Sequence, residues 1–199
     1  MSLVGSLRSF DLSRWAAAHE NVLSINLKES DIAEMVRETP VVFRGCLDKL
    51  LRFCDTQNVP VLIFSAGIAD VILQIMIQSE LWLPNMHMIS NEMIFDENGI
   101  CIGFKEPLIH VFNKNEASVV HTKHFSSIQD RRNVLLLGDS LGDLRMADGL
   151  SHDVSITIGF LNHDTEEWIE KYEDAYDIVV LNDSPMDIVC YLLEAIKLI

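Results

Sequence analysis

Residues 133–143 have the sequence Asn133-Val134-Leu135-Leu136-Leu137-Gly138-Asp139-Ser140-Leu141-Gly142-Asp143, and this stretch decides the fold. Its apolar run, bounded by polar residues, predicts a buried parallel strand. The strand leads directly into two carboxylates flanked by glycines, at the edge of the sheet where open α/β folds bind ligands. Asp139 and Asp143 are four residues apart, so both side chains can face one small cavity.

Two interpretations of this turn remain open. Hard oxygen ligands at the end of a strand suit Mg²⁺, which keeps several waters and is usually bound together with a substrate phosphate. The same residues also fit an ordinary turn into a helix that is capped by Asp139 or Ser140.

A second turn of this kind lies upstream. The apolar run Val59–Phe64 predicts another buried strand, followed by Ser65-Ala66-Gly67 and by a helix-compatible run from Ile68 to Ile77. A helix start offers free backbone N–H groups and a positive dipole end, and both favour a phosphate. A serine at this place is more often a helix N-cap. One turn suited to phosphate and one suited to a cation, each after a strand, favour a functional site.

A candidate cation for the phosphate follows the segment Leu108–Asn113, whose residues alternate or run apolar before Lys114. An ammonium group at this position can neutralise a phosphate oxygen or hold a carboxylate. A solvated lysine in a loop is the alternative, and it applies to most lysines.

These three segments resemble motifs two, three and four of the haloacid dehalogenase-type phosphohydrolases. More narrowly, residues 64–68, 108–114 and 136–149 are similar to the cytosolic pyrimidine 5′-nucleotidase family. The similarity continues through Gly159–Asn162 and Tyr172 to Asp177–Val179, so it covers nearly the whole chain. The resemblance implies a Rossmann-like α/β core at residues 43–199, without its first strand, and a partial helical cap at residues 1–42.

The resemblance also implies roles for individual residues. Ser65 and Lys114 would bind the phosphate, Ala66 would also belong to the substrate-binding site, and Asp139 would be the Mg²⁺ ligand. Asp143, the second acid of its motif, would orient Lys114 or a water at the metal. Trp15 would pack on the nucleobase, although a tryptophan in an amphipathic helix is more often a core or interface residue. The implied activity is Mg²⁺-dependent hydrolysis of nucleoside 5′-monophosphates, with pyrimidines preferred.

One part of the family pattern is missing. The family's nucleophilic aspartate lies on an Asp-x-Asp-x-Thr segment, and no Asp-x-Asp occurs among these 199 residues. Asp11 is the nearest imitation, but no apolar strand precedes it, so we interpret it as a helix N-terminal residue. We therefore expect this chain by itself to be inactive. A non-catalytic nucleotide- or partner-binding role and a phosphatase of non-nucleotide esters are the alternatives.

Composition narrows the classes of partner. The chain is 49% hydrophobic and can bury a sizeable core, and its net charge of −15 argues against nucleic acid or an anionic membrane as a partner. The four cysteines show no paired pattern and are expected to be reduced thiols of a cytoplasmic protein: Cys46, Cys54, Cys101 and Cys190. We expect no signal peptide and no membrane span. Composition does not indicate the oligomeric state.

The remaining elements follow from the turn residues. Two helices are expected between Leu12 and Pro40, the second capped by Ser30 or Asp31, and a core-facing helix over Val41–Cys54. A hairpin is expected around Asp96–Gly99. Further along, strands at 155–160 and 176–181 alternate with helices at 166–172 and from Ser184-Pro185 to 198.

Overall fold

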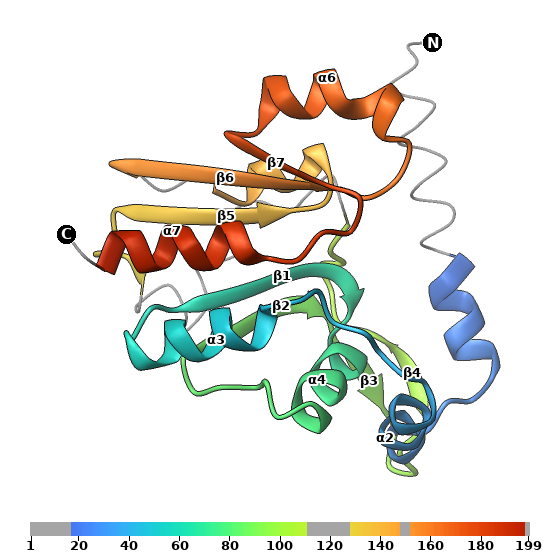
Figure 1. Ribbon diagram of the computed structural model, residues 1–199. Coiled ribbons are helices and arrows are strands. Elements are labelled where there is room, and N and C mark those ends of the chain that lie inside the picture. Colours follow the sequence, from blue (N-terminus) through green and yellow to red (C-terminus); the bar gives the residue numbers. More distant parts are fainter. Residues whose placement is uncertain (1–16, 111–127, 148–151, 198–199) are drawn as a thin grey trace. The chain divides into compact units, whose positions relative to one another are not determined.

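The computed structural model describes residues 17–110, 128–147 and 152–197 (Figure 1). These residues form two compact units. Within the described ranges, unit 1 contains residues 17–41, 63–82 and 88–110, and unit 2 contains residues 42–62, 83–87, 128–147 and 152–197. Along the chain, the first boundary between the two units lies after Val41. The boundary expected from the sequence, between the helical cap and the core, lies after residue 42. The expected partial cap at residues 1–42 and core at residues 43–199 stay predictions.

Unit 2 is built on a parallel sheet in the order β5-β6-β7. The strands are β5 (Asn133–Gly138), β6 (Val154–Leu161) and β7 (Ile178–Leu181). Strand β5 spans the residues expected from its apolar run, and its parallel pairing with β6 confirms that prediction. The 3-10 helix η2 (Leu141–Ala147) follows β5, and α6 (Thr165–Ala175) connects β6 with β7. This alternation of strand and helix is typical of α/β folds.

Helices cover both faces of the sheet. On one face, α3 (Leu47–Thr56) and α7 (Asp187–Lys197) pack on a core that includes Ile158 and Val189, both completely buried. On the other face, η2 and α6 pack around Leu136 and Tyr172. Burying one such aliphatic side chain contributes about 1.5–3 kcal/mol, so these two cores hold the three layers of unit 2 together.

Two glycines in register shape the second face. Gly138 on β5 pairs with Gly159 on β6. A Cβ on Gly159 would lie 2.5 Å from the ring of Tyr176, and one on Gly138 would lie 2.7 Å from the hydroxyl of Tyr176 and 2.6 Å from Cβ of Asp143. Only glycine leaves this space open, so the pair forms a slot on the sheet for Tyr176 and Asp143.

Unit 1 contains the larger part of two paired strands, β1 (Val61–Ile68) and β2 (Met86–Asn91). It also contains the helices α2 (Glu29–Glu38) and α4 (Ala69–Gln78) and the antiparallel hairpin of β3 (Met93–Phe95) and β4 (Cys101–Phe104). The hairpin confirms the turn predicted around Asp96–Gly99. Four buried residues form the core of this unit: Leu27, Ile32, Met93 and Cys101.

Three expected boundaries differ from the structure. Helix α2 has Lys28 as its N-cap, so the prediction of Ser30 or Asp31 is wrong; Asp31 instead accepts a hydrogen bond from the N–H of Lys28 at 3.2 Å. Helix α3 begins at Leu47 and not near Val41. Helix α6, expected at residues 166–172, continues to Ala175, so β7 begins at Ile178 and not at residue 176.

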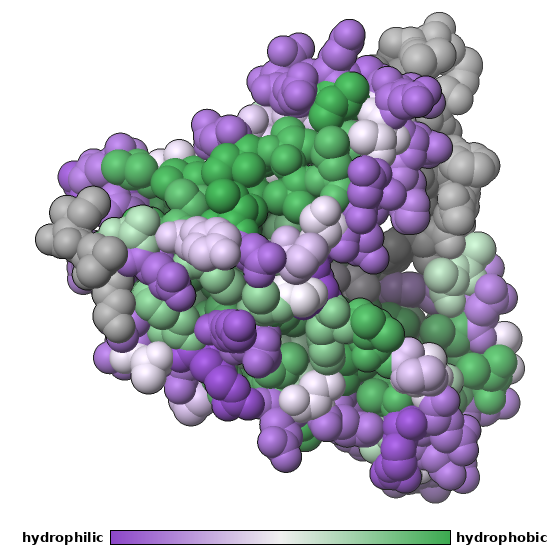
Figure 2. Space-filling view, in the orientation of Figure 1, coloured by the Kyte–Doolittle hydropathy of each residue, from purple (hydrophilic) through white to green (hydrophobic). Residues whose placement is uncertain are grey.

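The surface of unit 2 is not uniformly polar. Figure 2 shows hydrophobic residues gathered over β5 and β6, next to hydrophilic residues over α6.

Within the described residues, no helix combines the length and the apolar character needed to cross a membrane.

Candidate functional site

The carboxyl edge of the unit 2 sheet carries polar residues after each of its strands. Asp139 follows β5, Asn162 follows β6, and Asn182-Asp183 follow β7. Because the three strands are parallel, these residues share one edge of the sheet. This edge is where α/β folds place their ligands.

Asp143 organises the loop after β5. Its side chain is buried, with 3% exposure. Its Oδ2 accepts hydrogen bonds from the backbone N–H of Asp139 at 3.1 Å, from the N–H of Ser140 at 3.0 Å and from Oγ of Ser140 at 3.0 Å. A carboxylate that binds three donors of one loop fixes the loop backbone and sets where Asp139 leaves the sheet.

Two tyrosines of the α6 region hold the same loop from its carbonyl side. The hydroxyl of Tyr172 donates to the carbonyl oxygen of Asp139 at 2.7 Å, and that of Tyr176 donates to the carbonyl oxygen of Ser140 at 2.6 Å. Burial raises the pKa of both hydroxyls, and the nearby charges of Asp139 and Asp143 raise it further. Both tyrosines therefore stay protonated as donors.

The side chain of Asp139 is exposed at the end of β5, while its backbone is fixed on both sides. Among the residues that the structure describes, no group of three or more His, Cys, Asp or Glu is positioned to hold a metal. Mg²⁺ does not require such a group, because it is often bound by one or two carboxylates, waters and a substrate phosphate. A single exposed carboxylate on a rigid loop fits that donor set.

The Ser65-Ala66-Gly67 segment, expected as a turn after a strand, belongs to unit 1. The structure continues β1 through Ser65-Ala66-Gly67 to Ile68, so the strand is longer than the sequence predicts. Ile68 is the N-cap of α4, and Ser65 does not have that role. Instead, Oγ of Ser65 accepts the backbone N–H of Gly67 at 3.0 Å. A hydroxyl that accepts one hydrogen bond still has its own proton to donate, for example to a phosphate oxygen.

Two predicted site residues, Trp15 and Lys114, lie outside the described residues. His19, four residues after Trp15 in the sequence, is buried and stacks on the ring of Phe104 with 3.8 Å between centroids. Burial lowers the pKa of His19. In this structure the imidazole is therefore part of a packed pair in unit 1.

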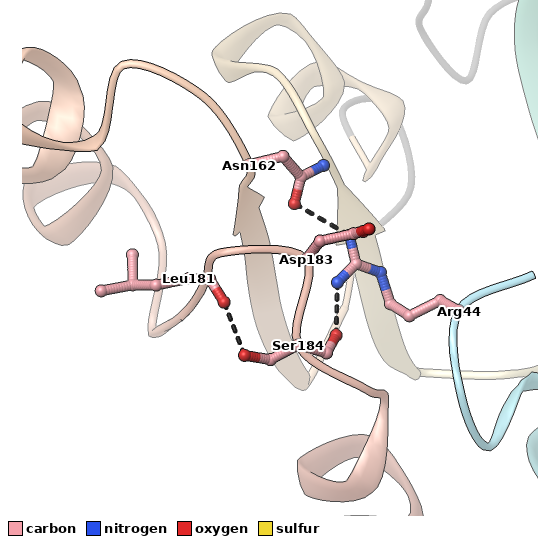
Figure 3. Close-up of polar contacts among 5 residues, drawn as sticks. All are labelled: Arg44, Asn162, Leu181, Asp183 and Ser184. Carbon is pink, nitrogen blue, oxygen red and sulfur yellow. Dashed lines mark hydrogen bonds and ion pairs between the residues drawn. The ribbon is translucent and has the colours of Figure 1, made fainter.

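Arg44 is a polar centre of the sheet edge that the sequence analysis missed (Figure 3). Its guanidinium donates to Oδ1 of Asn162 at 2.8 Å and to the carbonyl oxygen of Ser184, pairs with Asp183 at 3.0 Å, and lies 4.6 Å from the centroid of the Phe160 ring. These hydrogen bonds join residues 118 and 140 positions apart, so no local pattern marks Arg44. The tyrosine donors were missed for the same reason.

Residues 8–197 match the family described as pyrimidine 5′-nucleotidase (UMPH-1). The chain belongs to this family. The resemblance predicted from the motifs after β1 and β5 is thereby confirmed.

Curated relatives of this pyrimidine 5′-nucleotidase family member include 7-methylguanosine phosphate-specific 5′-nucleotidases. The protein of Gallus gallus is 42% identical over 183 residues, which is 92% of this chain and 63% of the relative. The human protein is 40% identical and is covered to 61%. A putative cytosolic 5′-nucleotidase 3 of Caenorhabditis elegans is 33% identical and is covered to 50%. The chain thus spans less than two thirds of the length of these relatives.

Solved structures confirm the predicted fold class. Cytosolic 5′-nucleotidase IIIB bound to cytidine matches 99% of this chain and 66% of its own chain, with a TM-score of 0.87 and 28% identity. A phosphoserine phosphohydrolase-like protein from Francisella tularensis has a TM-score of 0.52 at 15% identity and supports the fold alone. The chain has the α/β fold of haloacid dehalogenase-type phosphatases.

Proposed function

We propose that this chain is part of a Mg²⁺-dependent 5′-nucleotidase that hydrolyses nucleoside 5′-monophosphates to nucleoside and phosphate. The observation that carries the proposal is the loop after β5, where Asp143 and Tyr172 fix the backbone on both sides of the exposed Asp139 carboxylate. A rigid carboxylate at the carboxyl edge of a parallel sheet is suited to a hard cation. The cytosolic relatives' names support a cytoplasmic location.

The chain's own residues would bind and orient the substrate. Asp139 would hold Mg²⁺, which, when bound, screens the phosphate charge that repels an attacking nucleophile. The Ser65 hydroxyl would donate to a phosphoryl oxygen, and Lys114 would neutralise another. Asp143 would act by fixing the Asp139 loop, in addition to any role toward Lys114. The nucleophilic aspartate would come from the Asp-x-Asp-x-Thr segment that the family resemblance implies.

The base is the open part of the proposal. The family description and our sequence interpretation favour pyrimidine monophosphates, with Trp15 packing on the base. A second candidate is 7-methylguanosine monophosphate, because relatives 40–42% identical are named for that substrate. Phosphate release from cytidine, uridine and 7-methylguanosine monophosphates, measured side by side with a sugar phosphate, distinguishes these substrates from each other and from a non-nucleotide ester.

Asp139 provides the first test. We define the extended chain as this chain joined to an Asp-x-Asp-x-Thr segment of the family. In the extended chain, Asp139→Asn should lower kcat more than about 100-fold at saturating nucleotide, since a neutral amide is a poor ligand for Mg²⁺. A raised Mg²⁺ concentration should restore part of the rate. The measurement is phosphate release against Mg²⁺ concentration.

Asp153→Asn is the matched control. Asp153 is exposed, precedes β6 at its amino end and pairs only weakly with the exposed Arg132 at 3.3 Å. This substitution removes one negative charge without touching the loop after β5, so the Mg²⁺ dependence should not change. Equal Mg²⁺ curves for Asp139→Asn and the unsubstituted extended chain would reject Asp139 as the ligand.

A further inference from the structure

Asn91, at the end of β2 in unit 1, is buried more completely than any other polar side chain in the described residues, with 1% exposure. A buried amide has two N–H donors and a carbonyl acceptor, and leaving them unpaired costs about 1–3 kcal/mol. Where its hydrogen bonds go therefore shows what it holds in place.

The side-chain hydrogen bonds of Asn91 go to two backbone segments. Nδ2 donates to the carbonyl oxygens of Ala66 at 2.9 Å, Gly67 at 3.2 Å and Ile109 at 2.9 Å. Oδ1 accepts the N–H of Ile109 at 2.7 Å. One side chain thus joins the Ser65–Gly67 segment of β1 to the segment that leads toward Lys114 in the sequence.

The neighbouring side chains complete the arrangement. Oγ of Ser90 donates to the carbonyl oxygen of Gly67 at 2.7 Å. In a trans peptide the C=O and the following N–H point in opposite directions. With the Ala66 carbonyl turned toward Asn91, the N–H of Gly67 is turned the other way, where Oγ of Ser65 accepts it at 3.0 Å. The orientation of the Ser65 hydroxyl therefore depends on Asn91.

We propose that Asn91 is a positioning residue for phosphate binding, which acts by fixing the backbone of the Ser65–Gly67 segment of β1. The inference rests on the proposed function, because it assigns this segment to the phosphate of the substrate. Aspartate cannot replace Asn91, since a carboxylate can accept from Ile109 but cannot donate to the carbonyls of Ala66 and Gly67. Leucine of similar size can do neither.

The test compares Asn91→Asp and Asn91→Leu in the extended chain. Near pH 8 both variants should lose about 10- to 100-fold in kcat/KM for a nucleoside monophosphate, since a displaced binding segment misplaces the substrate. The new carboxyl would face carbonyl oxygens in a buried site, which raises its pKa. As the pH is lowered toward 6, its protonated form regains one donor, so the ratio of Asn91→Asp to the unsubstituted protein should rise.

This pH readout separates positioning from general destabilisation. Asn91→Leu has no donor at any pH, so its ratio should stay flat. Four charged groups lie next to these segments in the sequence and are present in every variant, so their titration cancels in the ratio: Asp70, Glu92, Lys105 and His110.

Asn85→Asp is the matched control, because Asn85 donates to the Val59 carbonyl at 2.8 Å at the other end of β2. It should leave kcat/KM unchanged.

Inorganic phosphate provides a readout without turnover. Its Kd, measured by isothermal titration calorimetry, should be about tenfold weaker for Asn91→Asp and unchanged for Asn85→Asp. If Asn91→Asp does not fold, Ser90→Ala removes a single hydrogen bond to the same segment of β1 and should weaken phosphate binding about two- to fivefold. Folding of each variant is checked by circular dichroism.

Each outcome separates the two claims. An extended chain that releases no phosphate from any monophosphate overturns the proposed function, and the phosphate Kd then still tests Asn91. Equal Kd values and a flat pH ratio in Asn91→Asp, in a protein that hydrolyses nucleotides, overturn the role of Asn91 and leave the proposed function standing.

Discussion

Tyr176 shows how one residue links the α6 helix to the loop that carries Asp139. Its ring occupies the slot above Gly159, and its hydroxyl donates to the Ser140 carbonyl. The raised pKa of this hydroxyl, caused first by burial and then by the charge of Asp143, has a consequence for stability. The folded protein keeps the proton at a pH where the unfolded chain, with a tyrosine pKa of about 10, has begun to lose it.

The first prediction concerns this alkaline pH dependence. The stabilisation from Tyr176 is complete below about pH 10 and is lost as the pH rises toward the folded-state pKa, since only the unfolded chain then releases the proton. In Tyr176→Phe, the free energy of unfolding should fall less steeply between about pH 10 and 11.5. Near pH 7 the variant should lose about 0.5–1.5 kcal/mol with the hydrogen bond to Ser140.

Urea denaturation across this pH range checks the prediction. Tyr191→Phe is the control, because Tyr191 is 67% exposed on α7 and should leave the alkaline slope as it is. Identical slopes for Tyr176→Phe and the parent chain would mean that the hydroxyl does not depend on the folded environment.

At the scale of residues, the sequence alone located the ends of the apolar runs but not the distant side chains that hold those ends in place. Asp139 was predicted at the end of a strand because the run before it and the glycines beside it are local signals. Tyr176, Asn91 and Arg44 contact their partners across 18 to 140 positions of the chain. Such pairings arise from tertiary packing, which a window of neighbouring residues does not contain.

At the scale of elements, the start of α3 shows how tertiary contacts override a local sequence pattern. Apolar spacing alone predicts a helix from Val41, yet the helix begins at Leu47. Arg44 and Gly45 are bound to the chain after β7, where the N–H of Met186 donates to the Gly45 carbonyl at 2.8 Å, and Cys46 adopts a left-handed backbone with φ of 70°. Tertiary hydrogen bonds therefore override helix propensity in this segment.

The second prediction tests the hydrogen bonds that Arg44 makes to the segments after β6 and β7. Arg44→Met keeps the apolar stem but removes the donors to Asn162 and Ser184 and the cation over Phe160. We expect a loss of about 2–4 kcal/mol in the free energy of unfolding, because hydrogen bonds from a charged group contribute about 1.5–3 kcal/mol and a cation–π contact about 0.5–1. Arg44→Lys keeps the charge but lacks the planar guanidinium group. Its free energy of unfolding should lie between those of the unsubstituted chain and Arg44→Met.

Asp183→Asn is the control for the ionic part. The side chain of Asp183 is 83% exposed, so its pair with Arg44 is screened by solvent and should contribute less than about 0.5 kcal/mol. Chemical denaturation of the three variants measures the difference. If Asp183→Asn destabilised the chain as much as Arg44→Met, the ion pair and not the hydrogen bonds would hold the segment.

At the scale of the whole molecule, the alternation of strands and helices was predictable and the pairing of the sheets was only partly so. The order β5-β6-β7 follows from short βα connections, which bring consecutive strands together. In the described residues β5 pairs with β6 alone and β1 pairs with β2 alone. Among the described residues, one edge of β1 and one edge of β5 thus pair with no further strand. Unpaired strand edges favour aggregation.

The last prediction separates architecture from chemistry. The family resemblance implies that the Asp-x-Asp-x-Thr segment carries a strand as well as the nucleophile. We therefore expect this chain alone to release no phosphate and to aggregate, as size-exclusion chromatography with light scattering would show. The extended chain should be monodisperse and active, because it has both the strand and the carboxylate.

An extended chain with the first aspartate of that segment changed to asparagine completes the design. It should be as monodisperse as the active version, since the strand is intact, but it should release no phosphate, since the nucleophile is gone. Mg²⁺-dependent phosphate release by this chain alone, abolished by Asp139→Asn, would contradict the prediction. It would require a nucleophile among the residues of this chain, and a search would begin at the carboxyl edge of β5.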